Sequence, residues 1–336
     1  MTRPIRVAVT GPNGSIGYAI LFRIASGELF GKDRPIELRL LDRNTPESRA
    51  RLEGTMMELS DCAFPLLTSM TAYNDEYSLF DGAECVFLIG AQPRKDGMDR
   101  SDLLRLNGEI FRKQGKALND RASRDVRVLV VGNPCNTNAL IAMRNAPDLS
   151  PECFSAMMRL DQNRAMARVA EKLNVPVGGV EQVFVWGNHS NTMYPDIRFL
   201  RYNGRRVDDQ FDEVWKESFI KNVATRGGQI IKARGASSAA SAASAAIDHM
   251  RDWILGSQGK VCTMAVPSDG SYGIPRGLVF GFPCLCPGEG RYQIIRNMPM
   301  TPEVNARLAT TRNGLRQQYV RGQKPGRQHQ SDACNV

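Results

Sequence analysis

Three side chains able to move or hold a proton fall in two short segments: Asp161 and Arg164 in segment 160–164, and His189 in segment 185–190. A carboxylate can orient an imidazole and stabilise its protonated form, which makes the ring a general acid or base. Arg164 lies one helical turn beyond Asp161, so its guanidinium would face the same cavity. Taken singly, the Asp161–Arg164 pair is also typical of a surface ion pair, and His189 of a structural histidine at the end of a strand.

A glycine-rich turn, Gly11-Pro-Asn-Gly14-Ser15-Ile16-Gly17, follows the first expected strand and precedes the first expected helix. Glycines let a ligand approach the backbone closely, and a helix start offers free N–H groups and a positive dipole, so the turn could bind a phosphate. Its GxxGxxG spacing differs from the usual GxGxxG, and an ordinary tight turn is the alternative.

Asp42 stands at the end of the second expected strand, where a carboxylate could accept hydrogen bonds from ribose hydroxyls. Its charge would repel a 2′-phosphate. Together with the glycine turn, Asp42 therefore favours NAD over NADP as a cofactor.

Two more polar segments follow expected strands. Segment 93–100 carries Arg94, Arg100 and a central glycine, which suits a mobile lid over an anionic substrate, because guanidinium groups bind carboxylates bidentately. A solvated basic loop is the alternative. Asn133 follows the expected strand at 126–131, where its amide could contact a ligand or cap the next helix.

These side chains need a scaffold that brings them together, and the first part of the chain alternates β-branched runs with longer amphipathic segments. Strands are expected at 5–10, 36–42, 85–89 and 126–131, and helices at 15–26, 45–59 and 101–120. This alternation predicts an α/β fold, a Rossmann-like doubly wound parallel sheet covered by helices.

The pattern loosens after about residue 150. Strands are expected at 182–186, 197–202, 261–266 and 278–283, and a helix of small residues at 237–255. We predict an NAD-binding domain at 1–155, a mixed α/β substrate domain at 156–320, and a basic disordered tail at 321–336.

Composition excludes several classes of protein. The chain of 336 residues is 42% hydrophobic and 24% charged, as folded soluble proteins are. No window approaches about 18 consecutive apolar residues and no signal-peptide core follows Met1, so we expect a cytoplasmic protein without a membrane partner. Eight scattered cysteines predict reduced thiols, and with only three histidines we expect no metal site.

The net charge of +9 could indicate a nucleic-acid partner. Between residues 304 and 331, however, there is no acidic residue, while the basic residues are Arg307, Arg312, Arg316, Arg321, Lys324 and Arg327. The last tenth of the chain carries most of the excess, so the body is only mildly basic and we disfavour nucleic acid.

Several motifs taken together resemble the cytosolic-type malate dehydrogenases of the lactate/malate dehydrogenase superfamily. They are segments 10–18, 57–67, 93–98, 133–138, 160–165, 186–190 and 268–273. The resemblance runs from about residue 5 to about residue 300. It implies a homodimer with NAD on the first domain and a small-molecule substrate between the two domains.

The resemblance also implies roles for matching residues. His189 would transfer the proton with Asp161 as its partner, and Arg164 would bind the carboxylate beside the reacting carbon. Arg94 and Arg100 would bind the distal carboxylate and the reacting oxygen. Asn133 matches a substrate-contacting amide, and the cofactor would contact Gly11, Gly14, Ser15, Ile16, Gly17, Asp42, Asn107, Gln114, Val131 and Asn133.

The predicted activity is therefore that of an NAD-dependent malate dehydrogenase, a tricarboxylic acid cycle reaction that interconverts malate and oxaloacetate. A related enzyme acting on lactate or aromatic 2-hydroxy acids is the nearest alternative, against which Arg94 argues. A nucleic-acid-binding protein on the same fold, motivated by the basic tail, is a second alternative.

Three positions depart from the family pattern. Gln162 stands where a histidine is common, next to Asp161. Arg43 follows Asp42 and could soften discrimination against NADP. From about Met298 the usual acidic final helix gives way to a basic sequence, which puts the C-terminal packing in question.

Overall fold

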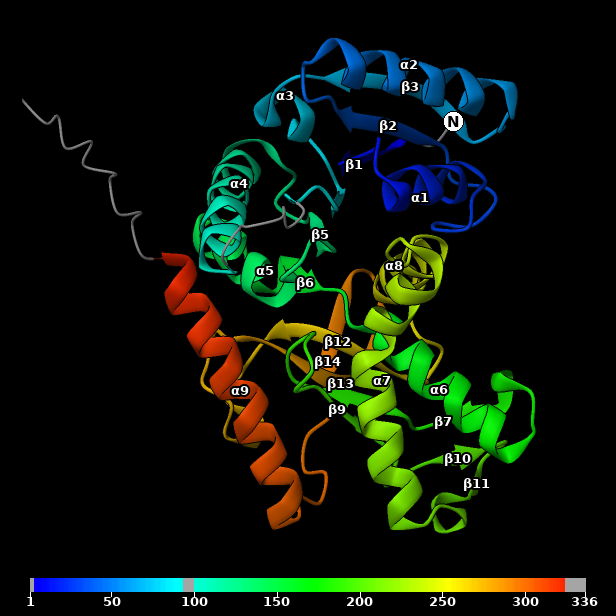
Figure 1. Cartoon of the computed structure of the whole chain (residues 1–336). Coiled ribbons are helices and arrows are strands. Elements are labelled where there is room, and N and C mark those ends of the chain that lie inside the picture. The colour runs from blue at the N-terminus through cyan, green and yellow to red at the C-terminus, as the bar shows by residue number, and fades with distance from the viewer. Residues whose placement is uncertain (1–2, 93–99, 324–336) are drawn as a thin grey trace, which may run out of the picture.

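The computed structural model describes residues 3–92 and 100–323, and its centre is one nine-stranded sheet of order β14-β13-β12-β6-β5-β4-β1-β2-β3 (Figure 1). The strands from the first half of the chain pair in parallel. They are β1 (Ile5–Thr10), β2 (Ile36–Leu41), β3 (Leu67–Tyr73), β4 (Cys85–Leu88), β5 (Arg127–Val130) and β6 (Phe154–Ala156).

The helices of this half connect the parallel strands. They are α1 (Ser15–Ala25), α2 (Pro46–Asp61), α3 (Glu76–Phe80), α4 (Arg100–Arg121) and α5 (Cys135–Arg144). β4 is buried along its whole length and β5 over most of it, as expected for parallel strands covered on both faces. The order of strands reverses between β1 and β4, and this switch point brings Gly11 against Gly90. The α/β class and the doubly wound parallel sheet predicted from the sequence are confirmed.

The second half extends the sheet with antiparallel strands β12 (Val261–Pro267), β13 (Val279–Gly288) and β14 (Arg291–Ile294). Short strands form two small sheets: β7 (Val180–Glu181), β8 (Phe184–Trp186), β9 (Tyr194–Asp196), β10 (Arg201–Tyr202) and β11 (Arg205–Arg206). The helices are α6 (Arg159–Leu173), α7 (Glu213–Arg234), α8 (Ala240–Leu255) and α9 (Pro302–Gln323). Among the described helices, none combines the length and apolar character needed to cross a membrane.

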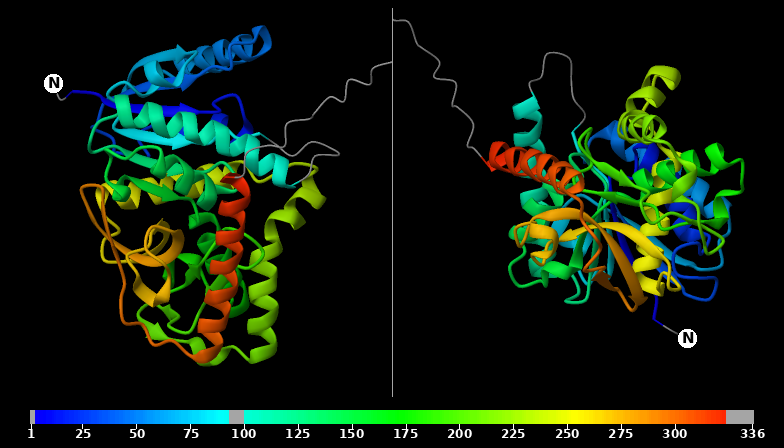
Figure 2. Two further views of the ribbon diagram at one scale, coloured as in Figure 1. Left: turned by 90° about the vertical axis from the view of Figure 1, so that its left-hand side faces the viewer. Right: turned by 90° about the horizontal axis from the view of Figure 1, so that it is seen from below.

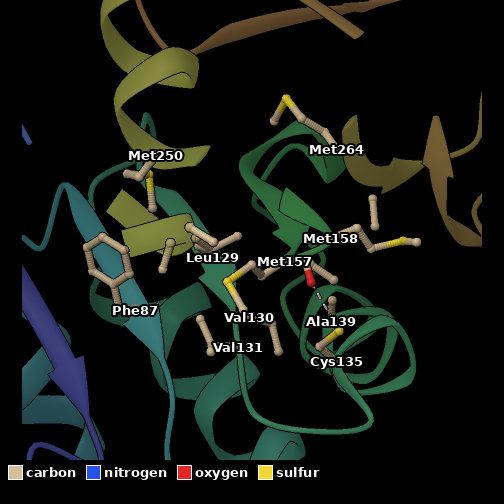
Figure 3. Close-up of a cluster of buried hydrophobic side chains, with 14 of the residues drawn as sticks. Phe87, Leu129, Val130, Val131, Cys135, Ala139, Met157, Met158, Met250 and Met264 are labelled. Atoms are coloured by element: carbon tan, nitrogen blue, oxygen red, sulfur yellow. Dashed lines mark hydrogen bonds between the residues drawn. The ribbon is translucent and has the colours of Figure 1, made fainter. Parts of the chain in front are cut away.

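The two halves share one hydrophobic core at the middle of the sheet. Figure 3 shows Phe87 and Leu129 packed near Met250 of α8, with Met157 and Met158 close by. All are buried. Figures 1 and 2 show the halves meeting along β6 and α8, where α8 also packs on α1. This continuous core fixes the start of α6, which carries Asp161, relative to the first half.

Three local expectations need correction. β3 was not foreseen, because it is a half-exposed edge strand of mostly small and polar residues without an apolar run. Of the expected strand at 197–202, only Arg201 and Tyr202 form a strand, β10, because residues 197–200 make the turn that follows β9. The tail was expected to be disordered from Arg321, but α9 continues to Gln323, since buried Leu315 and Tyr319 anchor its last turns.

Candidate active site

A cavity of about 680 Å³ opens at the carboxyl edge of the parallel strands. Its walls come from α1, α4, the segment after β5, α6, the segment after β8, and helices α7, α8 and α9. Five of the residues predicted from the sequence line it: Ile16, Val131, Asn133, Arg164 and His189. The structure thus brings three of the predicted cofactor-side residues to the same space as Arg164 and His189. Asp42 lines a second cavity, together with Arg49.

Asp161 is the centre of the charged group on this wall. It lies in the first turn of α6 and is fully buried, and its Oδ2 is 2.5 Å from His189 Nδ1. Arg164 Nη1 donates to Asp161 Oδ1 at 3.1 Å from the next turn. The carboxylate therefore holds an imidazole and a guanidinium side by side, both partly open to the cavity.

The charge of Asp161 raises the pKa of His189, with support from the hydrogen bond between them. Burial and the nearby Arg164 act in the opposite direction. Because Asp161 contacts Nδ1, Nε2 is the ring nitrogen that could exchange a proton with a ligand. The raised pKa favours the protonated form of the ring.

Asn136, which the sequence reasoning missed, fixes the backbone at His189. Its Oδ1 accepts from His189 N at 3.0 Å, and its Nδ2 donates to Gly187 O at 3.3 Å and Val279 O at 3.1 Å. The segment 133–138 contains several asparagines, and we assigned a role only to Asn133. Asn136 is fully buried, whereas Asn133 is exposed on the cavity wall.

Arg164 has a second partner that the sequence did not reveal. Its Nη2 donates to Ser238 Oγ at 3.3 Å, and Ser237 and Ser238 both line the cavity. Held on two sides, the guanidinium keeps a fixed place on the wall, where a bound carboxylate could accept its remaining N–H groups.

The glycine turn forms the start of α1. Gly11 has φ +69°, and a Cβ on Gly17 would lie 2.2 Å from the Gly11 carbonyl oxygen, so side chains at both positions are disfavoured. No side chain caps α1 at Gly14. The first N–H groups of the helix, from Ser15, Ile16 and Gly17, are thus available to an anion, as a dinucleotide pyrophosphate requires.

Asp42 joins this turn through Ser48. Ser48 Oγ donates to Asp42 Oδ1 at 2.7 Å, while Asn13 of the turn donates through Nδ2 to Ser48 O at 2.8 Å. Arg49 Nε lies 3.6 Å from Asp42 Oδ2. The cation beside the carboxylate is Arg49, and the backbone N–H of Arg43 donates to Ser48 Oγ at 3.4 Å.

The remaining predicted residues lie elsewhere. Asn107 is buried; its side chain accepts from Gln92 N at 2.7 Å and donates to Asn133 O at 3.4 Å. It therefore supports the segments that contain Gln92 and Asn133. Gln114 is buried in α4 and does not line the cavity. Arg94 lies outside the described residues, and Arg100 begins α4.

Gln162, the departure next to Asp161, is a packing residue. Its Nε2 donates to Val183 O at 3.0 Å and its Oε1 accepts from Thr263 N at 2.8 Å, which ties α6 to the strands behind it. An amide provides both a donor and an acceptor here, so the change leaves Asp161 and Arg164 in place. Within residues 3–92 and 100–323 no cluster of three His, Cys, Asp or Glu side chains could hold a metal ion.

The fold, the nucleotide turn and the charged group on the cavity wall together define an NAD-binding α/β oxidoreductase. Residues 5–155 match the sequence family described as lactate/malate dehydrogenase, NAD binding domain, and residues 158–324 match its alpha/beta C-terminal domain. The chain belongs to the lactate/malate dehydrogenase family.

Two solved structures are similar over nearly the whole chain. The malate dehydrogenase of Naegleria fowleri is 44% identical with a TM-score of 0.92, over 96% of this chain and 98% of that one. The lactate dehydrogenase of Trichomonas vaginalis, solved with NADH and oxamate, is 40% identical with a TM-score of 0.89, over 95% of this chain and 98% of that one. Both substrate classes of the family are therefore represented among similar structures.

Proposed function

We propose that the protein is an NAD-dependent malate dehydrogenase. The observation that carries this proposal is the placement of His189 and Arg164 on either side of buried Asp161 at the cavity wall. A proton-transfer group beside a carboxylate-binding group suits a 2-hydroxy acid, whose hydroxyl and carboxylate are on the same carbon.

In hydroxy-acid oxidation, neutral His189 accepts the hydroxyl proton at Nε2 while Arg164 holds the adjacent carboxylate. Asp161 stabilises the imidazolium that results, through its contact with Nδ1. Bound NAD supplies the acceptor for the hydride that leaves the same carbon. In keto-acid reduction, protonated His189 donates the proton to the oxygen on which negative charge develops.

The choice of a dicarboxylate depends on Arg94, since a second carboxylate needs a second cation. The 44% identity with a malate dehydrogenase is additional support. The second candidate, a lactate dehydrogenase, is favoured by the 40% identity with the Trichomonas vaginalis enzyme.

The test compares NADH consumption with oxaloacetate, pyruvate and an aromatic 2-keto acid. We expect kcat/KM to be highest for oxaloacetate. Arg94→Leu should lower kcat/KM for oxaloacetate by about 100-fold or more and affect pyruvate much less, because the distal carboxylate loses its partner. Lys95→Leu is the matched control, since it removes a neighbouring cation. A wild-type preference for pyruvate would contradict the proposal.

We include a cytoplasmic location and a homodimer in the proposal. The described cysteines, Cys62, Cys85, Cys135, Cys153, Cys262, Cys284 and Cys286, are free thiols, which suits a reducing compartment. Sedimentation velocity at micromolar concentration should give twice the monomer mass, and a monomer there would contradict the assembly.

A further inference from the structure

Helix α9 forms part of the cavity that contains His189. Gly314, Gln317, Gln318 and Arg321 lie on the cavity wall. Figures 1 and 2 show the C-terminal end of α9 beside α4 and α5, with which it is in contact. The C-terminal helix is thus part of the site, although its basic sequence departs from the family pattern.

One oxygen of this helix joins the two segments that hold His189. Gln318 Oε1 accepts from Asn188 Nδ2 at 3.1 Å and from Thr137 Oγ1 at 3.3 Å. Asn188 directly precedes His189, and Thr137 directly follows Asn136, whose Oδ1 accepts from His189 N. Gln318 therefore links Asn188 and Thr137. These are the sequence neighbours of His189 and Asn136, the two residues joined by the hydrogen bond at His189 N.

A second α9 residue fixes the same point. Thr311 Oγ1 accepts from Asn188 N at 2.9 Å, and Thr311 is fully buried. Gly187 has φ +103°, and a Cβ there would come within 2.4 Å of Thr311. Asn188 is therefore held by α9 through its backbone and its side chain together.

We propose that Gln318 is a positioning residue for His189, setting the distance between the imidazole and Asp161. Asp161 is fixed independently by α6, so the 2.5 Å contact depends on where α9 places the segment 187–189. Loss of the Gln318 acceptor leaves two donors without their partner and frees the ring to move away from the carboxylate. The inference rests on the proposed role of His189 in proton transfer.

The test variant is Gln318→Met, which keeps side-chain length and removes the acceptor. Gln318→Glu keeps the acceptor, and Asn313→Met is the control, since Asn313 is an exposed amide on the same helix outside the cavity. With only three histidines in the chain, proton NMR can follow the His189 ring, assigned with His189→Gln.

For Gln318→Met we expect the pKa of His189 to fall by about 0.5–1 unit, because the contribution of Asp161 weakens with distance. The turnover of keto-acid reduction should fall by about tenfold, with the NADH dissociation constant unchanged. The basic limb of its pH profile should move by the same amount as the NMR pKa. Gln318→Glu should restore turnover to within about threefold, with the pKa of His189 at or above its original value, since the added negative charge favours the protonated ring.

An unchanged His189 pKa in Gln318→Met would overturn the proposal. Equal losses of turnover in Gln318→Met and Gln318→Glu would also overturn it, because they would show that the shape of the side chain matters and its acceptor does not. If Gln318→Met does not fold, Asn188→Ala removes the same hydrogen bond from the other side and must lower the His189 pKa. Where both fold, the double variant should show little further loss. The NMR measurement needs no substrate, so a wild type that reduces no 2-keto acid would refute the proposed function and leave this test intact.

Discussion

Replacement of Asp161 by Asn tests the electrostatics of the site with the smallest change of shape. Asp161 is fully buried between His189 Nδ1 at 2.5 Å and Arg164 Nη1 at 3.1 Å. The variant removes the one negative charge between these groups and leaves the Arg164 cation beside the ring. Both effects lower the pKa of His189, since Asp161 is the main cause of its raised value and Arg164 opposes it.

The size of this fall follows from the geometry. Unit charges about 4 Å apart in an effective dielectric of about 20 interact by about 4 kcal/mol. At about 1.4 kcal/mol per pKa unit, full loss of this attraction amounts to about 3 units. The His189 side chain is 23% exposed, so water screens part of the interaction. We therefore expect a fall of about 2 units, which slows keto-acid reduction about 100-fold at a pH above both pKa values.

The assay is stopped-flow oxidation of NADH between about pH 6 and 9 with oxaloacetate and with pyruvate. NADH binding, measured by fluorescence, should be nearly unchanged, because the nucleotide turn lies on α1 and Asp161 on α6. Glu171→Gln is the matched control, an exposed carboxylate on the same helix. A folded Asp161→Asn protein that keeps more than about a tenth of wild-type turnover across this range would refute the reasoning.

Three further predictions concern pH, the cofactor and the nucleotide turn. The rate of keto-acid reduction should persist above the usual histidine pKa and fall once pH exceeds the raised pKa of His189. The rate of hydroxy-acid oxidation should rise over the same pH interval, and parallel pH profiles for the two directions would contradict this prediction. The wild type should use NADH at least about tenfold more efficiently than NADPH, and Asp42→Asn should reduce this preference for NADH. Equal use of the two cofactors by the wild type would argue against a cofactor-selecting role for Asp42. Gly17→Ala should weaken NADH binding and lower the melting temperature, because its Cβ would meet Gly11 O at 2.2 Å, whereas Gly178→Ala, whose Cβ meets nothing within 4 Å, should do neither.

The parts of the site that the sequence revealed depend on local signals. Strand, glycine turn and helix follow one another within a few residues around Gly11–Gly17, and Asp42 directly follows the next strand. Asp161 and Arg164 are one helical turn apart, so their contact follows from helix geometry. By contrast, Asn107 and Gln114 were predicted only because the chain resembles a family.

The supporting residues could not be found in this way, because their partners are distant in sequence. Ser238 meets Arg164 across 74 residues, and Thr311 meets Asn188 across 123. No spacing rule connects such pairs before the fold is known. Arg49 is the exception: it lies in the first turns of α2, and helix periodicity from Thr45 could have placed it near Asp42.

The C-terminal helix shows why charge composition misjudges packing. The basic residues of this region raised doubt about how it packs, yet Leu308, Thr311 and Leu315 recur at a spacing of three to four and are buried. Arg316 is exposed, and Arg307 pairs with Glu217 and Glu303. Because a helix separates its faces by periodicity, a change in net charge can be confined to the solvent side while the inner side keeps its contacts. Thr311 belongs to that inner side and Gln318 is half-buried beside it, so α9 reaches the His189 segment whatever the charge of its outer face.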